Sequence, residues 1–307
     1  AFIFLRRKLF QWHLLKTNYF SAPVIVVGNI TVGGTGKTPV VIALARFLKE
    51  KGWRPGIVSR GYGGKIKHFP YQVHQNSNAR EVGDEPLLIV RHTDCPTVID
   101  PNRSRGVRAL LKRAHCNLVI SDDGLQHSSL GRNIEIIVVD GERRFGNNFC
   151  LPAGPLREPT SRLNSVDFVI SKENPLRHEF KLSLIPDHFY QLIQPKIKKT
   201  LDYFHGKTLH AVAGIGNPDQ FFNSLRKLNL KIIEHPFPDH YLFKPHDFSY
   251  GSDAIIIMTE KDAVKCVGFV DARLWCLNTK TELDTNLLNT VLKRVTTLNN
   301  NLKSSSG

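Results

Sequence analysis

Short apolar runs alternate with amphipathic segments along the first half of the chain. The β-branched run at 24–27 predicts a buried strand, and after it Val41, Leu44, Ala45 and Leu48 recur at the spacing of one helical face. Further strands are predicted at 55–59, 97–99, 117–121, 134–139 and 166–170, with helices at 83–91 and 103–113. Strands that alternate with helices predict a parallel sheet with helices on both faces, which is an α/β fold.

The alternation weakens in the second half and then returns. Residues 172–206 do not show the alternation of apolar runs and amphipathic segments. We predict that they form a connector between a first domain at 21–171 and a smaller α/β domain at 207–298. In the smaller domain we predict strands at 209–213, 230–234, 254–258 and 274–276, a helix from Pro218 and a helix near 285–295. The polar residues 299–307 are predicted to be a frayed tail.

A glycine-rich turn joins the first strand to the first helix and has the pattern of a phosphate-binding P-loop. Its glycines let backbone N–H groups point at a phosphate chain, while Lys37 would reach the β- and γ-phosphates and Thr38 would bind Mg²⁺. Thr31 occupies the first glycine position of the full motif, and a turn without a ligand is the alternative. The predicted nucleotide-binding residues are Thr31, Val32, Gly33, Gly34, Thr35, Gly36, Lys37 and Thr38.

Acidic residues at a strand end supply candidate metal ligands. Asp122 and Asp123 follow the apolar run at 118–120, where the partner carboxylate of a P-loop binds Mg²⁺ directly or through water. A pair of acids in an ordinary turn is the alternative. Arg157 and Glu158, beside prolines, could clamp phosphate and metal or could only fix a loop.

Two other motifs are ambiguous from the residues alone. Asp84 and Glu85 open a predicted helix, where acidic side chains are ordinary N-terminal residues. His240 lies in a loop, and an isolated loop histidine is usually structural.

The charge of the chain indicates an anionic partner. The 307 residues carry a formal charge of +15, which suits nucleic acid, an anionic membrane surface or a phosphorylated substrate. No zinc-finger, RNA-recognition or basic-zipper pattern occurs, so nucleic acid is disfavoured. The five cysteines are scattered and lack CxxC spacing, so we interpret them as reduced thiols of a protein that faces the cytosol.

Residues 1–20 mix large apolar side chains with basic ones. Too many charges interrupt this segment for a membrane-spanning helix. An interfacial helix would instead place one apolar face in the membrane and basic residues around it: Phe2, Leu5, Leu9 and Trp12 against Arg6, Arg7, Lys8 and Lys16. A helix packed on its own domain is the alternative. Because the sequence begins with Ala1, we expect that further residues precede it.

Seven motifs occur in an order that resembles one known family. They are VGNITVGGTGKTP (27–39), SRGY (59–62), GDEP (83–86), DDGLQH (122–127), LPAGPLRE (151–158), FPDHY (237–241) and TEKDA (259–263). This set resembles the tetraacyldisaccharide 4′-kinases, the lipid A 4′-kinases of Gram-negative bacteria, over residues 22–266. In that family a threonine also stands at the position of Thr31.

The resemblance implies a reaction and a location. It implies phosphoryl transfer from ATP, with Mg²⁺, to the 4′-hydroxyl of a tetraacylated glucosamine disaccharide 1-phosphate, which gives lipid IVA. It places the protein at the cytoplasmic face of the inner membrane, held by an N-terminal helix that is partly missing here. We expect an anionic membrane surface as partner, no nucleic acid and no obligate protein partner.

The resemblance also assigns roles to residues. Asp84 corresponds to the general base and His240 to the histidine that supports it. Lys37 and Arg157 would neutralise charge on the transferring phosphate. Mg²⁺ would be organised by Thr38, Asp122 and Glu158, with Asp123 nearby.

Two other function classes stay open at this stage. A P-loop NTPase that acts as a switch or motor would need no lipid acceptor; residues 259–262 faintly resemble the base-reading loop of GTPases, but there a residue separates Lys from Asp. A non-enzymatic basic binding protein would leave the P-loop and Asp122 without a purpose.

Overall fold

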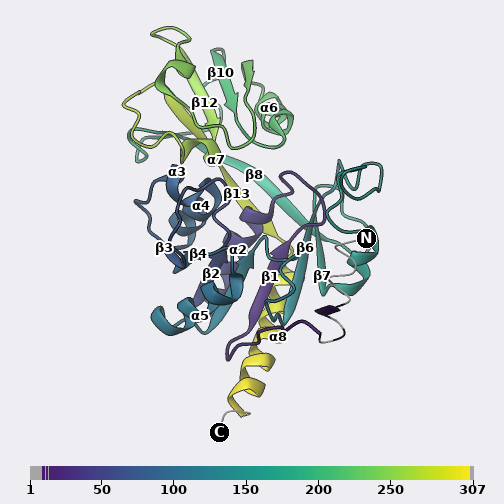
Figure 1. Ribbon diagram of the computed structural model, residues 1–307. Helices are drawn as coiled ribbons and strands as arrows, with labels where there is room; N and C mark the ends of the chain where they lie inside the picture. Colours follow the sequence, from purple (N-terminus) through teal and green to yellow (C-terminus); the bar gives the residue numbers. More distant parts are fainter. Residues whose placement is uncertain (1–8, 11, 13, 305–307) are drawn as a thin grey trace.

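The computed structural model describes residues 9, 10, 12 and 14–304 (Figure 1). Much of the predicted interfacial segment, including Phe2, Leu5 and residues 6–8, therefore lies outside the described residues. None of the described helices has an apolar stretch of the length needed to cross a bilayer.

The described part of the chain forms one 13-stranded sheet with helices packed on it. The strands are β1 (Val24–Gly28), β2 (Pro55–Ser59), β3 (Tyr71–Val73), β4 (Thr97–Ile99), β5 (Leu118–Asp122), β6 (Ile134–Asp140), β7 (Phe168–Lys172), β8 (Phe180–Gln191), β9 (Lys198–Lys199), β10 (Thr208–Ala213), β11 (Lys231–Pro236), β12 (Ile255–Thr259) and β13 (Leu274–Leu283). The α-helices are α2 (Lys37–Glu50), α3 (Ala79–Val82), α4 (Asp84–Thr93), α5 (Arg103–Arg113), α6 (Pro218–Lys227), α7 (Glu260–Ala263) and α8 (Thr285–Ser304). The strand order is β11-β10-β12-β13-β8-β7-β6-β1-β5-β2-β4-β3, and β9 pairs with β8.

The first half of the sheet is parallel around β1. β5 and β6 flank β1, β2 lies beyond β5, and β7 lies beyond β6. Because successive side chains of a strand face opposite sides, Ile25 and Val27 pack with α2 and α8. Val24 and Val26 pack with α5 on the other face. The predicted α/β fold, covered on both faces, is confirmed.

The second half repeats this arrangement on a smaller scale. β10 pairs in parallel with β11 and β12, and β13 continues the parallel ladder. Phe221, Phe222 and Leu225 of α6 pack on the apolar face of these strands. The smaller α/β unit is therefore present at the end of the sheet that Figure 1 shows at the top.

The two halves are joined where the sequence pattern was weakest. The segment 172–206 contains the 12-residue strand β8, which pairs antiparallel with β13 and carries the sheet from one half to the other. Its alternation is hard to recognise because it includes Pro186, Asp187 and His188 and is only partly covered. The sheet crosses the predicted boundaries at 171 and 207, and these boundaries stay predictions.

One local prediction was wrong. α8 continues to Ser304, whereas residues 299–307 were predicted to be a tail. Asparagines occupy 299–301, and asparagine has a low helix propensity. The helix continues because Leu298 still packs on the core and extends the apolar face of α8. Residues 305–307 lie outside the described part. The polar stretch at 65–80, for which no element was predicted, contains β3 and the start of α3.

Candidate functional site

The P-loop forms an open turn at the start of α2. Gly33 and Gly36 both have φ of +94°, a left-handed conformation that glycine adopts without strain. A Cβ atom at Gly34 would meet nothing within 4 Å, so the mouth of the loop is open. No side chain caps α2 and no acidic residue lies in its first turn, which leaves its N–H groups available to an anion. The buried Thr35 hydroxyl also has no hydrogen-bond partner. A bound phosphate would provide one.

This turn opens into a large cavity between the two halves of the protein. The cavity has a volume of about 1620 Å³, and Lys37, Asp122, Arg157, His240 and Lys261 are among the side chains that line it. A pocket for one small ligand has a volume of roughly 300–1,000 Å³. The cavity therefore has room for a nucleotide and for the polar part of a second substrate.

Two cations converge on Asp123 beside the P-loop. Lys37 Nζ lies 3.5 Å from Asp123 Oδ1, and the Arg157 guanidinium donates to both carboxylate oxygens at 3.2 and 3.1 Å. Although burial works in the opposite direction, Lys37 and Arg157 lower the pKa of Asp123. Arg157 reaches this place because its backbone N–H donates to the Ile30 carbonyl at 2.6 Å, which fixes the 151–158 loop against the P-loop.

Asp122 lies deeper, at the end of β5. Its Oδ2 accepts a hydrogen bond of 3.0 Å from the Ser59 hydroxyl. Burial, together with the neighbouring Glu85 and Asp123, raises the pKa of Asp122 to about 7. A buried carboxylate with acidic neighbours is short of positive charge, which a divalent cation would provide. Asp122 thus has the environment expected of a Mg²⁺ ligand, and Thr38 lines the same cavity.

Glu158 has a different environment. Gln126 Nε2 donates to its Oε1 at 2.8 Å, and Arg162 Nε lies 3.4 Å from its Oε2, so both oxygens already have protein partners. Within the described part of the chain, no three His, Cys, Asp or Glu side chains form a group that could hold a metal ion. Protein sites for Mg²⁺ usually supply one or two carboxylates, and water and substrate phosphate complete the coordination. The predicted ligand role of Glu158 stays a prediction.

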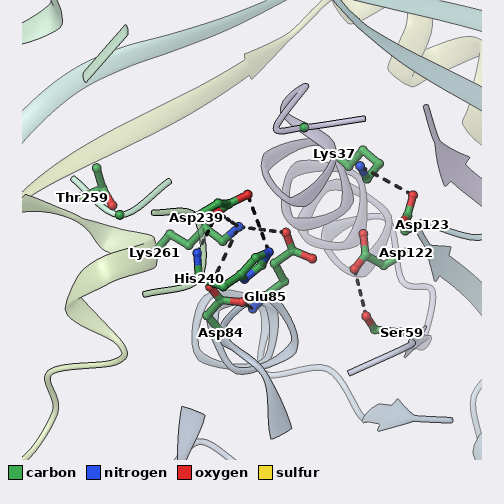
Figure 2. Close-up of polar contacts among 12 residues, drawn as sticks. Lys37, Ser59, Asp84, Glu85, Asp122, Asp123, Asp239, His240, Thr259 and Lys261 are labelled. Carbon is green, nitrogen blue, oxygen red and sulfur yellow. Dashed lines mark hydrogen bonds and ion pairs between the residues drawn. The ribbon is translucent and has the colours of Figure 1, made fainter. Parts of the chain in front are cut away.

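Asp84 and His240 meet across the junction of the two halves (Figure 2). Asp84 begins α4, whereas His240 lies in the loop after β11, yet His240 Nδ1 donates to Asp84 Oδ2 at 3.1 Å. Burial alone would raise the pKa of Asp84, but the hydrogen bond from His240 and the charge of Lys261 lower it. The same hydrogen bond raises the pKa of His240. The ionised carboxylate and the protonated imidazole therefore stabilise each other.

The structure adds residues to this pair that we did not assign from the sequence. Lys261, from the TEKDA motif, lies beside Asp84, and the Tyr62 ring packs on His240 with a centroid separation of 5.1 Å. Both belong to motifs that carried the family resemblance, so these motifs could have indicated them as candidate site residues. The sequence assigns no role to Lys261 within the TEKDA motif, because the contact of this motif with α4 depends on the tertiary fold.

The arrangement defines a class of protein. A parallel sheet with a P-loop, an acidic residue at the end of a neighbouring strand and a second unit that covers the cleft is the arrangement of a P-loop phosphotransferase.

Comparisons with known proteins assign the family. The family model described as "LpxK: Tetraacyldisaccharide-1-P 4'-kinase" matches residues 1–297. The tetraacyldisaccharide 4′-kinase of Coxiella burnetii (strain RSA 331 / Henzerling II) is 50% identical over 274 residues, which are 89% of this chain and 81% of that protein. The corresponding kinase of Methylobacillus flagellatus is 48% identical over 298 residues, with 96% and 89% covered.

A solved structure agrees with this result. The crystal structure of LpxK from Aquifex aeolicus in complex with ATP matches with a TM-score of 0.79 and 28% identity, and the match covers 96% of this chain and 95% of that one. The chain belongs to the tetraacyldisaccharide-1-P 4′-kinase family. It is therefore a kinase that uses ATP with Mg²⁺, and the predicted family, enzyme class and cofactors are confirmed. The roles predicted for single residues remain predictions.

Proposed function

We propose that this protein transfers the γ-phosphoryl group of ATP to the 4′-hydroxyl of a tetraacylated glucosamine disaccharide 1-phosphate and so forms lipid IVA. The observation that carries the proposal is the position of the Asp84–His240 pair. His240 lines the same cavity as Lys37, so a hydroxyl acceptor beside the pair would face the phosphates on the P-loop. A protein that only hydrolysed nucleotide would not need this cavity to extend beyond the nucleotide.

Asp84 acts as the general base in this proposal. A sugar hydroxyl is a weak acid, so an anionic base must be aimed at it while the phosphoryl group transfers. The pKa of Asp84 is lowered, so its carboxylate stays ionised at neutral pH. A weak base suffices because the transition state is loose and catalysis depends mostly on positioning and charge. His240 holds the carboxylate in its orientation.

The remaining polar side chains stabilise the charge of the transferring group. Lys37 and Arg157 both form ion pairs with Asp123, and both side chains can turn from it toward phosphate oxygens. Mg²⁺, held by Thr38 and Asp122 with Asp123 and Glu158 nearby, would supply further positive charge to the phosphates.

The second half of the protein closes the cleft over the P-loop. A Cβ atom at Gly216 would lie 3.1 Å from the backbone nitrogen of Gly34, so the backbones of these two loops lie close together. Closure of this kind keeps water from the phosphates and favours transfer over hydrolysis. It supports a kinase rather than a switch or motor.

We also propose that the protein works at the cytoplasmic face of the inner membrane. The acyl chains of the acceptor lie in the membrane, and the chain carries a formal charge of +15. In the described N-terminal residues Trp12, Leu14 and Tyr19 have 62%, 68% and 73% of their surface exposed. Phe10 and Tyr19 also line the cavity, so large apolar side chains of the N-terminal residues lie at the edge of the site.

A nucleotide-consumption assay with and without the acylated disaccharide tests the proposed function. We expect ATP consumption that depends on the lipid acceptor. Turnover that is equal without the lipid would support the NTPase alternative, and no turnover under either condition would support a binding protein.

A further inference from the structure

The ammonium group of Lys261 lies among three carboxylates beside the Asp84–His240 pair (Figure 2). Its Nζ is 3.2 Å from Glu85 Oε1, 3.4 Å from Asp239 Oδ1 and 3.9 Å from Asp84 Oδ2. Glu85 and Asp84 begin α4 in the first half, whereas Lys261 and Asp239 belong to the second half. One cation therefore joins acidic groups from both halves at the proposed base.

The surroundings of the pair are strongly charged. The groups that face it are Glu85 on α4, Asp239 in the loop after β11, Lys261 on α7, Lys265 after α7 and Tyr62 in the loop after β2. Burial lowers the pKa of Lys261, but Glu85, Asp84 and Asp239 outweigh it and raise the pKa, so Lys261 stays protonated. Its charge in turn lowers the pKa of both Asp84 and His240.

The carboxylates alone would favour extra protons on the pair. Asp84 must be ionised to accept the proton of a hydroxyl, so only His240 of the two groups can be protonated. Without a nearby cation, Glu85 and Asp239 would make a second proton, on Asp84, more favourable. The charge of Lys261 opposes that second proton.

A role as a simple latch between the halves is the competing explanation. His92 Nε2 lies 3.0 Å from Glu260 Oε1, so α4 and α7 share a second polar contact that does not involve the pair. A latch at Lys261 would act through contacts, and its loss would lower activity equally at every pH. An electrostatic role would change the dependence on pH.

We propose that Lys261 is a positioning residue for the phosphoryl transfer, which brings a compensating positive charge to the Asp84–His240 pair when the two halves meet. Glu85 and Asp239 hold the ammonium group at the pair. The inference rests on the proposed function, because it concerns the same base.

The dependence of kcat/KM on pH, measured with detergent-dispersed acceptor, tests the proposal. We expect the acid limb of the profile to move up by about one pH unit in Lys261→Met. Lys261→Arg keeps the charge and should restore the position of the limb. Lys261→Gln provides a second neutral variant that retains hydrogen bonding, and Lys231→Met removes a positive charge from the exposed face of β11 as the matched control.

Titration of the His240 ring by NMR, without substrates, gives a readout that does not depend on activity. The resonance is assigned as the one absent in His240→Gln, and its pKa should rise in Lys261→Met and Lys261→Gln but not in Lys261→Arg. Unchanged titration and an unshifted acid limb in both neutral variants would overturn the proposal and favour the latch. If the wild-type protein does not phosphorylate the lipid, the proposed function fails, whereas the NMR titration still decides whether the charge of Lys261 acts on the Asp84–His240 pair.

Discussion

His240 Nδ1 lies 3.1 Å from Asp84 Oδ2, although the two residues are 156 positions apart in the sequence. One residue begins a helix of the first half and the other lies in a loop of the second half. The hydrogen bond can therefore form only when the halves are together. The proposed base is completed by the same contact that covers the cleft, which ties proton acceptance to closure.

Lys37→Ala should abolish transfer. No other amine at the start of α2 can replace the one that lies beside Asp123 at the mouth of the P-loop. Removal of one such group should lower kcat by at least about 100-fold. Steady-state kinetics test this, with Lys51→Ala at the exposed end of α2 as the control. Near-normal turnover in Lys37→Ala would remove the P-loop from its central place in the mechanism.

Asp84→Ala should lower kcat by about 100-fold or more, with little change in ATP binding, because a general base acts on the acceptor. His240→Ala should have a milder effect of the same kind. Because the two side chains act as one unit, the double variant should lose less than the product of the two single losses. Kinetics of all four proteins test this coupling, and a plain product would show that the residues act independently.

The Asp84–His240 pair should stabilise the fold in a limited pH range. The pKa of His240 is raised, so its contribution is complete below the unfolded value near 6.5 and is lost as the pH rises through the folded value. The pKa of Asp84 is lowered, so its contribution is present above about 3.9 and is lost as the pH falls through the folded value.

His240→Gln should therefore cost about 1 kcal/mol of unfolding free energy at pH 6 and less at pH 9. Denaturant unfolding of both proteins at the two pH values measures the difference. An equal cost at pH 6 and pH 9 would mean that the charge of His240 does not contribute.

Gly216→Ala should weaken closure over the P-loop. The added methyl group would lie 3.1 Å from the Gly34 nitrogen and 3.2 Å from Asp239 Oδ2, so the loops must move apart at a cost of about 1 kcal/mol. We expect a lower kcat and a larger share of ATP lost to hydrolysis. The ratio of ADP released to lipid phosphorylated measures this, with Ser252→Ala in an exposed loop as control. An unchanged ratio would show that the approach of the loops does not matter for transfer.

Neutralisation of Arg6, Arg7 and Lys8 should weaken binding to anionic vesicles. Each basic residue near such a surface contributes roughly 1 kcal/mol, and salt reduces this contribution. Turnover of membrane-embedded acceptor should fall, while turnover of detergent-dispersed acceptor should change much less. Vesicle co-sedimentation at low and high salt tests the prediction, and unchanged binding at low salt would favour a helix packed on its own domain.

Local sequence patterns were enough to predict the core of the fold and the P-loop. β1 and β5 are buried on both faces, so their apolar runs are continuous, and the glycines before Lys37 are adjacent in the sequence. β8 lacks such a pattern because only part of it is covered, and its role in joining the halves depends on pairing with β13.

The pairing of Asp84 with His240 could not be predicted from the spacing of residues in the sequence. Acidic residues at a helix start and a loop histidine have ordinary explanations, and only the family resemblance linked Asp84 to His240. The position of Lys261 depends on how α7 meets α4, and no local pattern encodes that contact.

The position of the transferred phosphate tests the central claim most directly. The wild-type protein and Asp84→Asn are incubated with ATP, Mg²⁺ and the tetraacyldisaccharide 1-phosphate, and the lipid product is analysed by two-dimensional ³¹P–¹H NMR. We predict a new phosphomonoester coupled to the proton at C4′ with the wild-type protein, and almost none with Asp84→Asn. ATP turnover without phosphate at C4′, or equal transfer by Asp84→Asn, would contradict the proposed reaction and its base.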